Sequence, residues 1–298
     1  MRDIIFIHTK KIPLYLKLAI YQAVSVMPDV RVHLITDRVF RSKMVTTYSL
    51  EDYMQSANDF KQKYVHRSSY SYDFELFCFQ RWFILRDFVS KTKLEKSFLY
   101  LDSDVFLYSD FFQKLELGDF KMTVTSGFWP QYSLFKDEEA IIDFSNFISG
   151  YFSLKEKNDY LEEWWQTQFV QKNIFGGVCD MTLLGLYSSN CLDLFEVKEG
   201  YFNTTVGAIK EDAVKLGLDV NQFNLSRFSY KNEKATISDV KIHALHFQAG
   251  AKILAAKYYC GRYRKVINFY GFLSLKKLSL KRKLKWIKKL LLIVLQKI

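Results

Sequence analysis

Hydrophobic and polar positions near the start of the chain follow a strand, helix, strand pattern. Residues 4–7 form a short apolar run that predicts a buried strand, and a helical pattern extends from about residue 14 to residue 27. A second strand is predicted over residues 31–36. This order is typical of a βαβ unit in a mostly parallel sheet. Such sheets bind ligands at the carboxyl ends of their strands, so we expect a site there.

A second helix is predicted over residues 73–90, where Phe77, Arg81, Ile84 and Phe88 recur on one face. Arg81 is the charged member of this apolar face. A guanidinium that loses hydration needs an anionic partner. That partner is either a ligand or an intramolecular carboxylate, unless the side chain extends out to water.

Two carboxylates follow the next apolar run, residues 98–101, which predicts a short buried strand. Asp102 and Asp104 are two positions apart, so on an extended backbone both side chains lie on the same side. They repel each other unless a cation lies between them. The pattern predicts a divalent metal with oxygen ligands, most simply Mg²⁺ or Mn²⁺ bridging a substrate diphosphate. The alternative is that each aspartate caps a turn or the next helix.

Paired glycines at residues 176–177 precede Asp180 and an apolar helical run over residues 181–187. Two glycines permit close approach of the backbone to a ligand, or an unusual turn. Asp180 also stands where a helix cap would stand. Both interpretations stay open.

Residues 240–252 alternate like a strand and contain His243, His246 and Lys252. A lone histidine is mostly structural, but a neutral imidazole is an ordinary third ligand for a metal held by two carboxylates. The pattern does not choose between His243 and His246.

With these residues, the chain resembles nucleotide-sugar-dependent glycosyltransferases of the GT-A fold, in particular the family of glycogenin and the bacterial lipopolysaccharide galactosyl- and glucosyltransferases. In that family an aspartate pair binds Mn²⁺ across the UDP diphosphate, a later histidine supplies a further ligand, and a lysine six residues on contacts the phosphates. The interval from His246 to Lys252 matches. The family's glycine three residues after the histidine is displaced to Gly250, and its following Pro-Trp is Ile253-Leu254.

The resemblance implies a role for each matching residue. The implied metal ligands are Asp102, Asp104 and His246, and the implied donor-binding residues are Ile7, His8, Thr9, Arg81, Asp102, Ser103, Gly250 and Lys252. The end of the first strand would hold the base and ribose, and Arg81 would reach the donor sugar or diphosphate. These implied roles cover roughly residues 1–252.

The chemistry of such a transfer needs both charge stabilisation and a proton acceptor. A metal with Arg and Lys donors stabilises the nucleotide diphosphate as it leaves. In an inverting enzyme a carboxylate takes the proton of the acceptor hydroxyl, and Asp180 is the candidate catalytic residue. In a retaining enzyme Asp180 would orient the acceptor or face the anomeric carbon.

One competing hypothesis uses the same local string. Residues 101–105 also fit the first motif of haloacid-dehalogenase phosphatases, in which Asp102 would be a phosphorylated nucleophile. Such enzymes need a later acidic pair after another apolar strand, and no Asp or Glu follows Asp239. This absence disfavours the phosphatase hypothesis.

Charge is distributed unevenly along the chain. The formal net charge is +11, from 43 Lys and Arg against 32 Asp and Glu. The 15 cations after Asp239 leave residues 1–239 with a formal charge of −4. A uniformly basic nucleic-acid binder is not built this way, so nucleic acid is not an expected partner.

The basic C-terminal segment also carries an apolar seam. Residues 274–298 include nine Lys or Arg, with Trp286 nearby, around the seam Leu280, Leu284, Ile287, Leu291, Val294 and Ile298. This pattern predicts an amphipathic helix on an anionic membrane surface. The alternatives are a helix docked on the body or in a dimer, and a non-enzymatic module that binds membrane or nucleic acid.

The sequence thus predicts an α/β, Rossmann-like GT-A catalytic domain over residues 1–271 and a membrane-associating helix over residues 272–298. The four cysteines form no CxxC pair, and neither a signal-peptide core nor a spanning segment is recognisable. We therefore expect a cytoplasmic enzyme, peripheral on the inner face of the cell membrane. It would transfer sugar from a UDP-linked donor to a glycan or glycolipid acceptor in polysaccharide or lipopolysaccharide synthesis.

Overall fold

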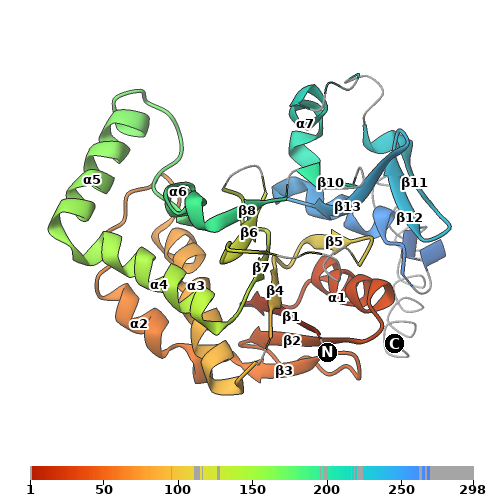
Figure 1. Ribbon diagram of the computed structural model, residues 1–298, viewed down its shortest axis with the longest axis horizontal. Helices are drawn as coiled ribbons and strands as arrows, with labels where there is room; N and C mark the ends of the chain where they lie inside the picture. Colours follow the sequence, from red (N-terminus) through yellow and green to blue (C-terminus); the bar gives the residue numbers. More distant parts are fainter. Residues whose placement is uncertain are drawn as a thin grey trace, which may run out of the picture. The chain divides into compact units, whose positions relative to one another are not determined.

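The computed structural model describes residues 2–94, 96–110, 115, 117–125, 128–194, 196–197, 201–215, 217, 219, 224–261, 264–265 and 267–268 (Figure 1). The predicted amphipathic helix, residues 272–298, lies outside the described residues. The chain divides into two compact units: unit 1 holds residues 1–47, 101–116 and 194–298, and unit 2 holds residues 48–100 and 117–193. Within the described part of the chain, no helix has the length and apolar character needed to cross a membrane.

In the described residues, unit 1 is built mainly from strands, and α1 is its longest helix. Its elements are β1 (Arg2–His8), α1 (Leu14–Val26), β2 (Val30–Thr36), β5 (Val105–Leu107), β9 (Glu196–Val197), β10 (Tyr201–Thr205), α7 (Ile209–Lys215), β11 (Phe228–Lys231), β12 (Lys234–Ile237), β13 (Val240–His246) and the 3-10 segment η8 (Ala249–Tyr258).

Unit 2 is built mainly from helices. Its elements are α2 (Gln55–Lys61), α3 (Tyr72–Thr92), β6 (Met122–Val124), β7 (Tyr132–Phe135), α4 (Glu138–Ser153), α5 (Lys155–Trp165), a π-helical turn (Gln166–Val170), α6 (Asp180–Leu186) and β8 (Cys191–Asp193). Strands β3 (Thr46–Ser49) and β4 (Phe98–Leu101) each include residues of both units.

The sheets confirm the predicted α/β class. A seven-stranded sheet has the order β3-β2-β1-β4-β7-β6-β8, and a second sheet has the order β11-β12-β13-β10-β9, with β5 paired to β13. Strands β1 and β2 are parallel in register from Arg2 opposite Val30 to His8 opposite Thr36, with α1 as the connection. Strands β6 and β8 are also parallel, whereas β7 is antiparallel to β6. The predicted strands and helix of the first βαβ unit are therefore confirmed.

A buried glutamine joins three segments of unit 1. Gln22 of α1 is fully buried, and its Nε2 donates to the carbonyl of Leu107 in β5 at 2.9 Å. Its Oε1 accepts from the backbone N–H groups of Cys260 at 2.9 Å and Gly261 at 3.0 Å. A buried amide stabilises a fold when it is hydrogen-bonded, and these three bonds use both acceptor sites and one of the two donor hydrogens of Gln22. Gln22 thereby holds β5 against α1.

The predicted helix over residues 73–90 is α3, and aromatic rings pack around it. Ile84 and Phe88 of the predicted face are fully buried, and Phe77 and Arg81 are partly buried. Phe60 of α2 stacks on Phe83, with ring centroids 4.6 Å apart. Such ring pairs add to the apolar burial that holds helices together.

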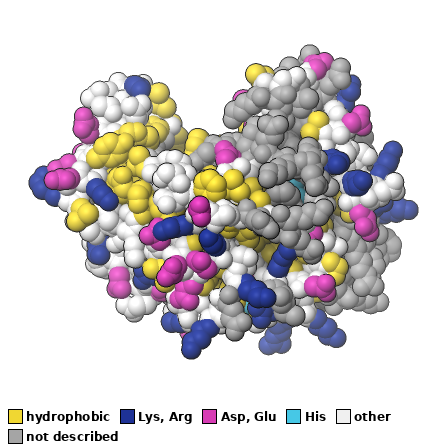
Figure 2. Space-filling model, in the orientation of Figure 1, with side chains coloured by type: hydrophobic (Ala, Val, Ile, Leu, Met, Phe, Trp, Pro, Cys, Tyr) yellow, Lys and Arg dark blue, Asp and Glu magenta, His cyan; other side chains and the backbone are white. Residues whose placement is uncertain are grey.

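Exposed hydrophobic side chains are also present in unit 2. Figure 2 shows them gathered around α5 and α6 on the face that it presents. Phe175 is 66% exposed, Ile174 52% and Val170 47%. Contiguous apolar surface of this kind marks places where ligands or partners bind.

The paired glycines allow two loops of unit 2 to touch. Gly177 forms an antiparallel bridge with Ser68, and the flanking bonds run from Ser69 N to Gly176 O at 2.9 Å and from Val178 N to Arg67 O at 2.8 Å. A Cβ on Gly177 would lie 2.3 Å from the Cα of Ser68. The glycine pair was expected to serve either a close approach to a ligand or an unusual turn. In the structure it permits an unusual backbone contact between two loops of the protein.

The close approach predicts that Gly177→Ala destabilises the protein. Overpacking of a site whose neighbour is backbone costs about 1–3 kcal/mol of unfolding free energy, measured by urea titration. The matched control is Gly185→Ala in α6, because a Cβ there would meet nothing closer than Phe128 at 3.9 Å. Alanine in that exposed helical position should be neutral or stabilising. Equal stabilities for the two variants would contradict the packing argument.

Candidate metal and donor site

Pairing between β5 and β13 brings the aspartate segment to the histidine. Strand β4 ends at Leu101 and β5 begins at Val105, so Asp102 and Asp104 lie in the turn between them. Strand β13 is antiparallel to β5, with His246 opposite Val105. The N–H of Phe247 donates to the carbonyl oxygen of Asp104 at 2.9 Å, which continues the contact past the last paired residues.

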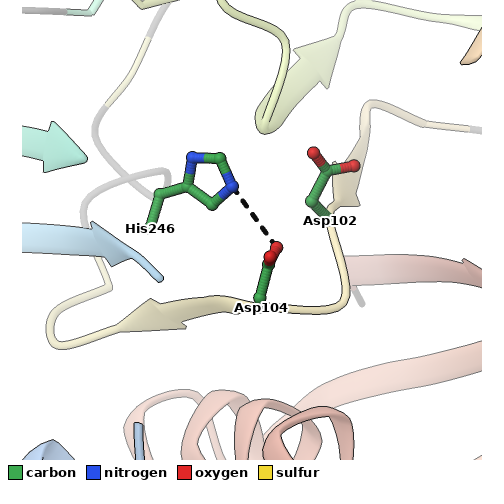
Figure 3. Close-up of side chains that lie close together, drawn as sticks. All are labelled: Asp102, Asp104 and His246. Atoms are coloured by element: carbon green, nitrogen blue, oxygen red, sulfur yellow. Dashed lines mark ion pairs between the residues drawn. The ribbon is translucent and has the colours of Figure 1, made fainter. Parts of the chain in front are cut away.

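Three side chains converge at this point. Asp102, Asp104 and His246 each offer one ligand atom, and these atoms all lie within 4.8 Å of one another. Figure 3 shows the His246 ring turned toward the Asp104 carboxylate, with Asp102 beside them. The Nε2 of His246 is 3.3 Å from Asp104 Oδ1. Asp104 is 5% exposed and His246 7%, so water competes weakly for both groups.

Lys252 brings a positive charge to the cluster. Its Nζ is 3.0 Å from Asp104 Oδ2 and 5.2 Å from the centre of the Tyr15 ring. Burial alone would raise the pKa of the Asp104 carboxyl, but the hydrogen bonds and charges of His246 and Lys252 outweigh burial and lower it. Burial would lower the pKa of Lys252, and the Asp104 charge outweighs this and raises it. The arrangement keeps both groups ionised.

The donor set fits a hard divalent cation. Carboxylate oxygens suit Mg²⁺ and Mn²⁺, and one imidazole is compatible with Mn²⁺. Two ligands each about 2.1 Å from one ion lie at most about 4.2 Å apart, so small side-chain rotations would close the set. The Nδ1 of His246 lies 3.3 Å from the Thr205 hydroxyl, a contact that turns Nε2 toward the aspartates. The sequence did not single out Thr205, because only the β10–β13 pairing brings it near.

Of the two candidate histidines, His246 joins the aspartates and His243 does not. His243 is fully buried, and its Nδ1 contacts the Ser109 hydroxyl. Burial lowers the pKa of His243 to about 3, so it stays neutral. His243 is therefore a residue of the core and not a member of the metal cluster.

The end of β1 lies near the same charges. Burial lowers the pKa of His8, and the Lys252 cation adds to this, whereas the carbonyl of Lys11 and the carboxylates of Asp37 and Asp104 act in the opposite direction. His8 Nε2 is 3.3 Å from that carbonyl. Ile7 is buried, and Thr9 is partly exposed at the end of the strand. These positions are compatible with the predicted donor-binding role of residues 7–9.

The remaining unit 1 candidates lie in the two turns that frame the cluster. Ser103 is partly exposed between the aspartates, and Gly250 is exposed in η8 with no atom within 4 Å of the place where a Cβ would stand. The backbone that favours glycine is one residue earlier, because Ala249 has φ +49°. That position is three residues after His246, where the resembling family has its glycine. Because the glycine of this chain is Gly250, the left-handed position is occupied by Ala249.

Arg81 and Asp180 form a buried pair in unit 2. Asp180 is 2% exposed, and its Oδ2 accepts from Arg81 Nε at 3.1 Å, from Arg81 Nη2, and from Trp82 Nε1 at 3.0 Å. Arg81 Nη1 donates to the Tyr100 hydroxyl at 3.3 Å. An intramolecular carboxylate is therefore one partner of Arg81. Asp180 is the first residue of α6 and Cys179 is the N-cap, so the interpretation of Asp180 as the cap is wrong by one position.

Comparison with known proteins gave matches only among solved structures. No protein-family model and no curated protein sequence matches the chain. The glycosyltransferase GlyE of Streptococcus pneumoniae TIGR4 is 16% identical with a TM-score of 0.46, over 93% of this chain and 62% of GlyE. The galactosyltransferase LgtC, in complex with donor and acceptor sugar analogues, is 12% identical with a TM-score of 0.44, over 96% of this chain and 99% of LgtC.

The bifunctional glycosyltransferase WbbM is 9% identical with a TM-score of 0.48, over 97% of this chain and 51% of WbbM. The chain thus spans less than two thirds of GlyE and about half of WbbM. The structures that it resembles include glycosyltransferases, the class named from the sequence. At these identities, the activity of the chain has to be argued from its own residues.

The left-handed backbone at Ala249 predicts that Ala249→Gly stabilises the protein. Relief of the Cβ clash outweighs the greater freedom of the unfolded chain, for a gain of about 0.5–1 kcal/mol in unfolding free energy, measured by urea titration. The control is Gly250→Ala, whose Cβ would meet nothing within 4 Å and should change stability little. A loss of stability in Ala249→Gly would show that residue 249 carries no strain.

Proposed function

We propose that this protein transfers a sugar from a nucleotide diphosphate donor, UDP-linked, to a glycan or glycolipid acceptor, with Mn²⁺ or Mg²⁺ as cofactor. The observation that carries the proposal is the convergence of Asp102, Asp104 and His246, with the Lys252 ammonium on Asp104. Two carboxylates, an imidazole and a cation in one partly buried cluster suit a metal beside a diphosphate better than a structural turn.

Each residue of the cluster has a role in this proposal. Asp102, Asp104 and His246 would hold the cation, which supplies positive charge to the diphosphate as it leaves. Lys252 pairs with Asp104 in the structure, and its flexible stem would let the ammonium turn to a phosphate oxygen instead. The backbone at Ser103 and Gly250 and the strand end at residues 7–9 would bind the rest of the donor.

The Arg81–Asp180 pair would act on the sugars. Arg81 would reach the donor sugar or its diphosphate, and Asp180 would orient the acceptor hydroxyl or take its proton. Because Asp180 Oδ2 already accepts from Arg81 and Trp82, its carboxylate is fixed in one orientation. A fixed carboxylate suits the positioning of a hydroxyl group.

The metal prediction is tested with Asp104→Asn, which keeps the size of the side chain and removes its charge. We expect Mn²⁺ affinity, measured by electron paramagnetic resonance, to fall about tenfold or more, together with metal-dependent hydrolysis across a panel of UDP- and GDP-sugars. The matched control is Asp119→Asn, an exposed aspartate of unit 2. Circular dichroism of both variants checks that they fold.

Two outcomes would contradict the proposal. Unchanged Mn²⁺ binding and turnover in Asp104→Asn would make the aspartate pair structural. Phosphatase activity without turnover of any nucleotide sugar would favour the alternative in which Asp102 is a phosphorylated nucleophile.

We also propose that residues 272–298 bind the anionic inner face of the cell membrane, which would place a cytoplasmic enzyme near a lipid-linked acceptor. The support is the sequence pattern of nine cations around an apolar seam. We expect the full chain to sediment with vesicles that contain phosphatidylserine, and a chain of residues 1–271 to remain in solution. Raised salt should weaken the binding, because each cation contributes about 1 kcal/mol at low screening. Equal sedimentation of both chains would exclude this role.

A further inference from the structure

A buried glutamate lies beside the Arg81–Asp180 pair in unit 2 and has no role in the proposed chemistry. Glu75, in the first turn of α3, is 2% exposed. Its Oε2 accepts from the hydroxyl of Ser68 at 2.8 Å. The Ser68 oxygen in turn accepts from the N–H of Tyr70 at 3.2 Å. The side chain is therefore held in place inside the unit.

Glu75 interacts electrostatically with the pair. Burial raises the pKa of Glu75 to about 7, and the Asp180 charge also raises it, whereas the Ser68 hydrogen bond and the Arg81 charge lower it. Two other titratable groups, Tyr64 and Cys179, also feel the charge of Glu75, and burial holds both above their usual pKa. They stay neutral in the range where Glu75 titrates. Arg81 and Asp180 are thus the charged groups that face it.

We propose that Glu75 is a positioning residue that, while protonated, leaves the Arg81 guanidinium paired with Asp180, and whose ionisation sets an upper pH limit for that arrangement. For its effect on turnover, this inference rests on the proposed function. Its effects on the pair and on stability do not.

Charge balance supports the inference. With Glu75 protonated, one guanidinium faces one carboxylate and the buried cluster is neutral. Ionised Glu75 adds an uncompensated negative charge in a place with little water, where it repels Asp180 and competes for Arg81. Since the carboxylates share one cation, ionisation of Glu75 weakens the hold of Arg81 on Asp180.

A second connection runs through the backbone. Ser68, which donates to Glu75, is bridged to Gly177, three residues before Asp180. A change in the hydrogen bond of Ser68 therefore acts on the loop that leads into α6. Glu75 is linked to Asp180 both by charge and by this loop.

Thermal unfolding of Glu75→Gln against wild type tests whether Glu75 titrates as described. A carboxyl whose pKa is raised in the folded state contributes stability that is present below its unfolded pKa and is lost as the pH rises through its folded pKa. The difference in midpoint temperature, variant minus wild type, should grow by about 2 °C or more between pH 4.5 and pH 7.5 and then stay constant. The control is Glu138→Gln, a partly exposed glutamate that accepts a similar bond from Ser90 at 2.6 Å.

The indole N–H signal of Trp82 tests whether Glu75 affects the pair, because this group donates to Asp180 at 3.0 Å. In protein labelled with ¹⁵N-tryptophan, with the signal assigned from Trp82→Phe, we expect a shift with a midpoint near pH 7 in wild type and in Glu138→Gln. The shift should be absent in Glu75→Gln. In Ser68→Ala the midpoint should move to higher pH. The hydroxyl of Ser68 stabilises ionised Glu75, so its removal raises the pKa of Glu75.

If the protein transfers sugar as proposed, turnover should show the same titration. Wild type and Glu138→Gln should lose activity above pH 7, and Glu75→Gln should retain it to about pH 8.5, while the neutral-pH rate changes less than about threefold.

The inference would be overturned, whatever the activity, if the stability difference did not change with pH or if the Trp82 signal did not shift with pH. Identical pH profiles in an active protein would remove the effect on turnover. Absence of any turnover would count against the proposed function, and the Trp82 titration would still decide the role of Glu75.

Discussion

Carboxylates held inside a folded chain require positive charge nearby, and this requirement organises both units. At the turn between β4 and β5 the charge comes from Lys252, and His246 lies beside the same carboxylate because β13 pairs with β5. Strand β5 is also tied to α1 through the amide of Gln22. The candidate metal site therefore depends on a strand contact between segments that are far apart in the sequence.

Unit 2 satisfies the same requirement in a different way. Asp180 receives a guanidinium and an indole N–H from neighbouring residues of α3, so one helix supplies both donors. Glu75, earlier on that helix, accepts from the neutral Ser68 hydroxyl, and burial raises its pKa so that it keeps its proton to a higher pH. Of the two carboxylates near Arg81, Glu75 is thus the one whose pKa burial raises, and neighbouring carboxylates in different environments are common in functional sites.

Local patterns in the sequence were sufficient for the first βαβ unit, for α3 and for the strand before Asp102, because each has a strong periodicity or a clear apolar run. They also identified the groups that form the candidate metal site. They could not choose between His243 and His246, since the choice depends on the register of β13 against β5. Nor could they show that Gly177 meets Ser68, or that the left-handed residue is Ala249 and not Gly250. Those features arise from contacts between segments that are far apart in the sequence, and patterns within a short stretch of sequence do not show such contacts.

The contact between Lys252 and Asp104 links the two ligands of the proposed reaction. The ammonium compensates the carboxylate that a divalent cation would need. A cation on Asp104 would weaken the hold of this carboxylate on Lys252, and a phosphate that binds Lys252 would leave Asp104 with less positive charge beside it. Each ligand removes the competitor of the other, so under the proposed function metal and donor bind with positive cooperativity. By thermodynamic linkage the enhancement is the same in both directions. The ion pair then compensates the buried carboxylate until the first ligand binds.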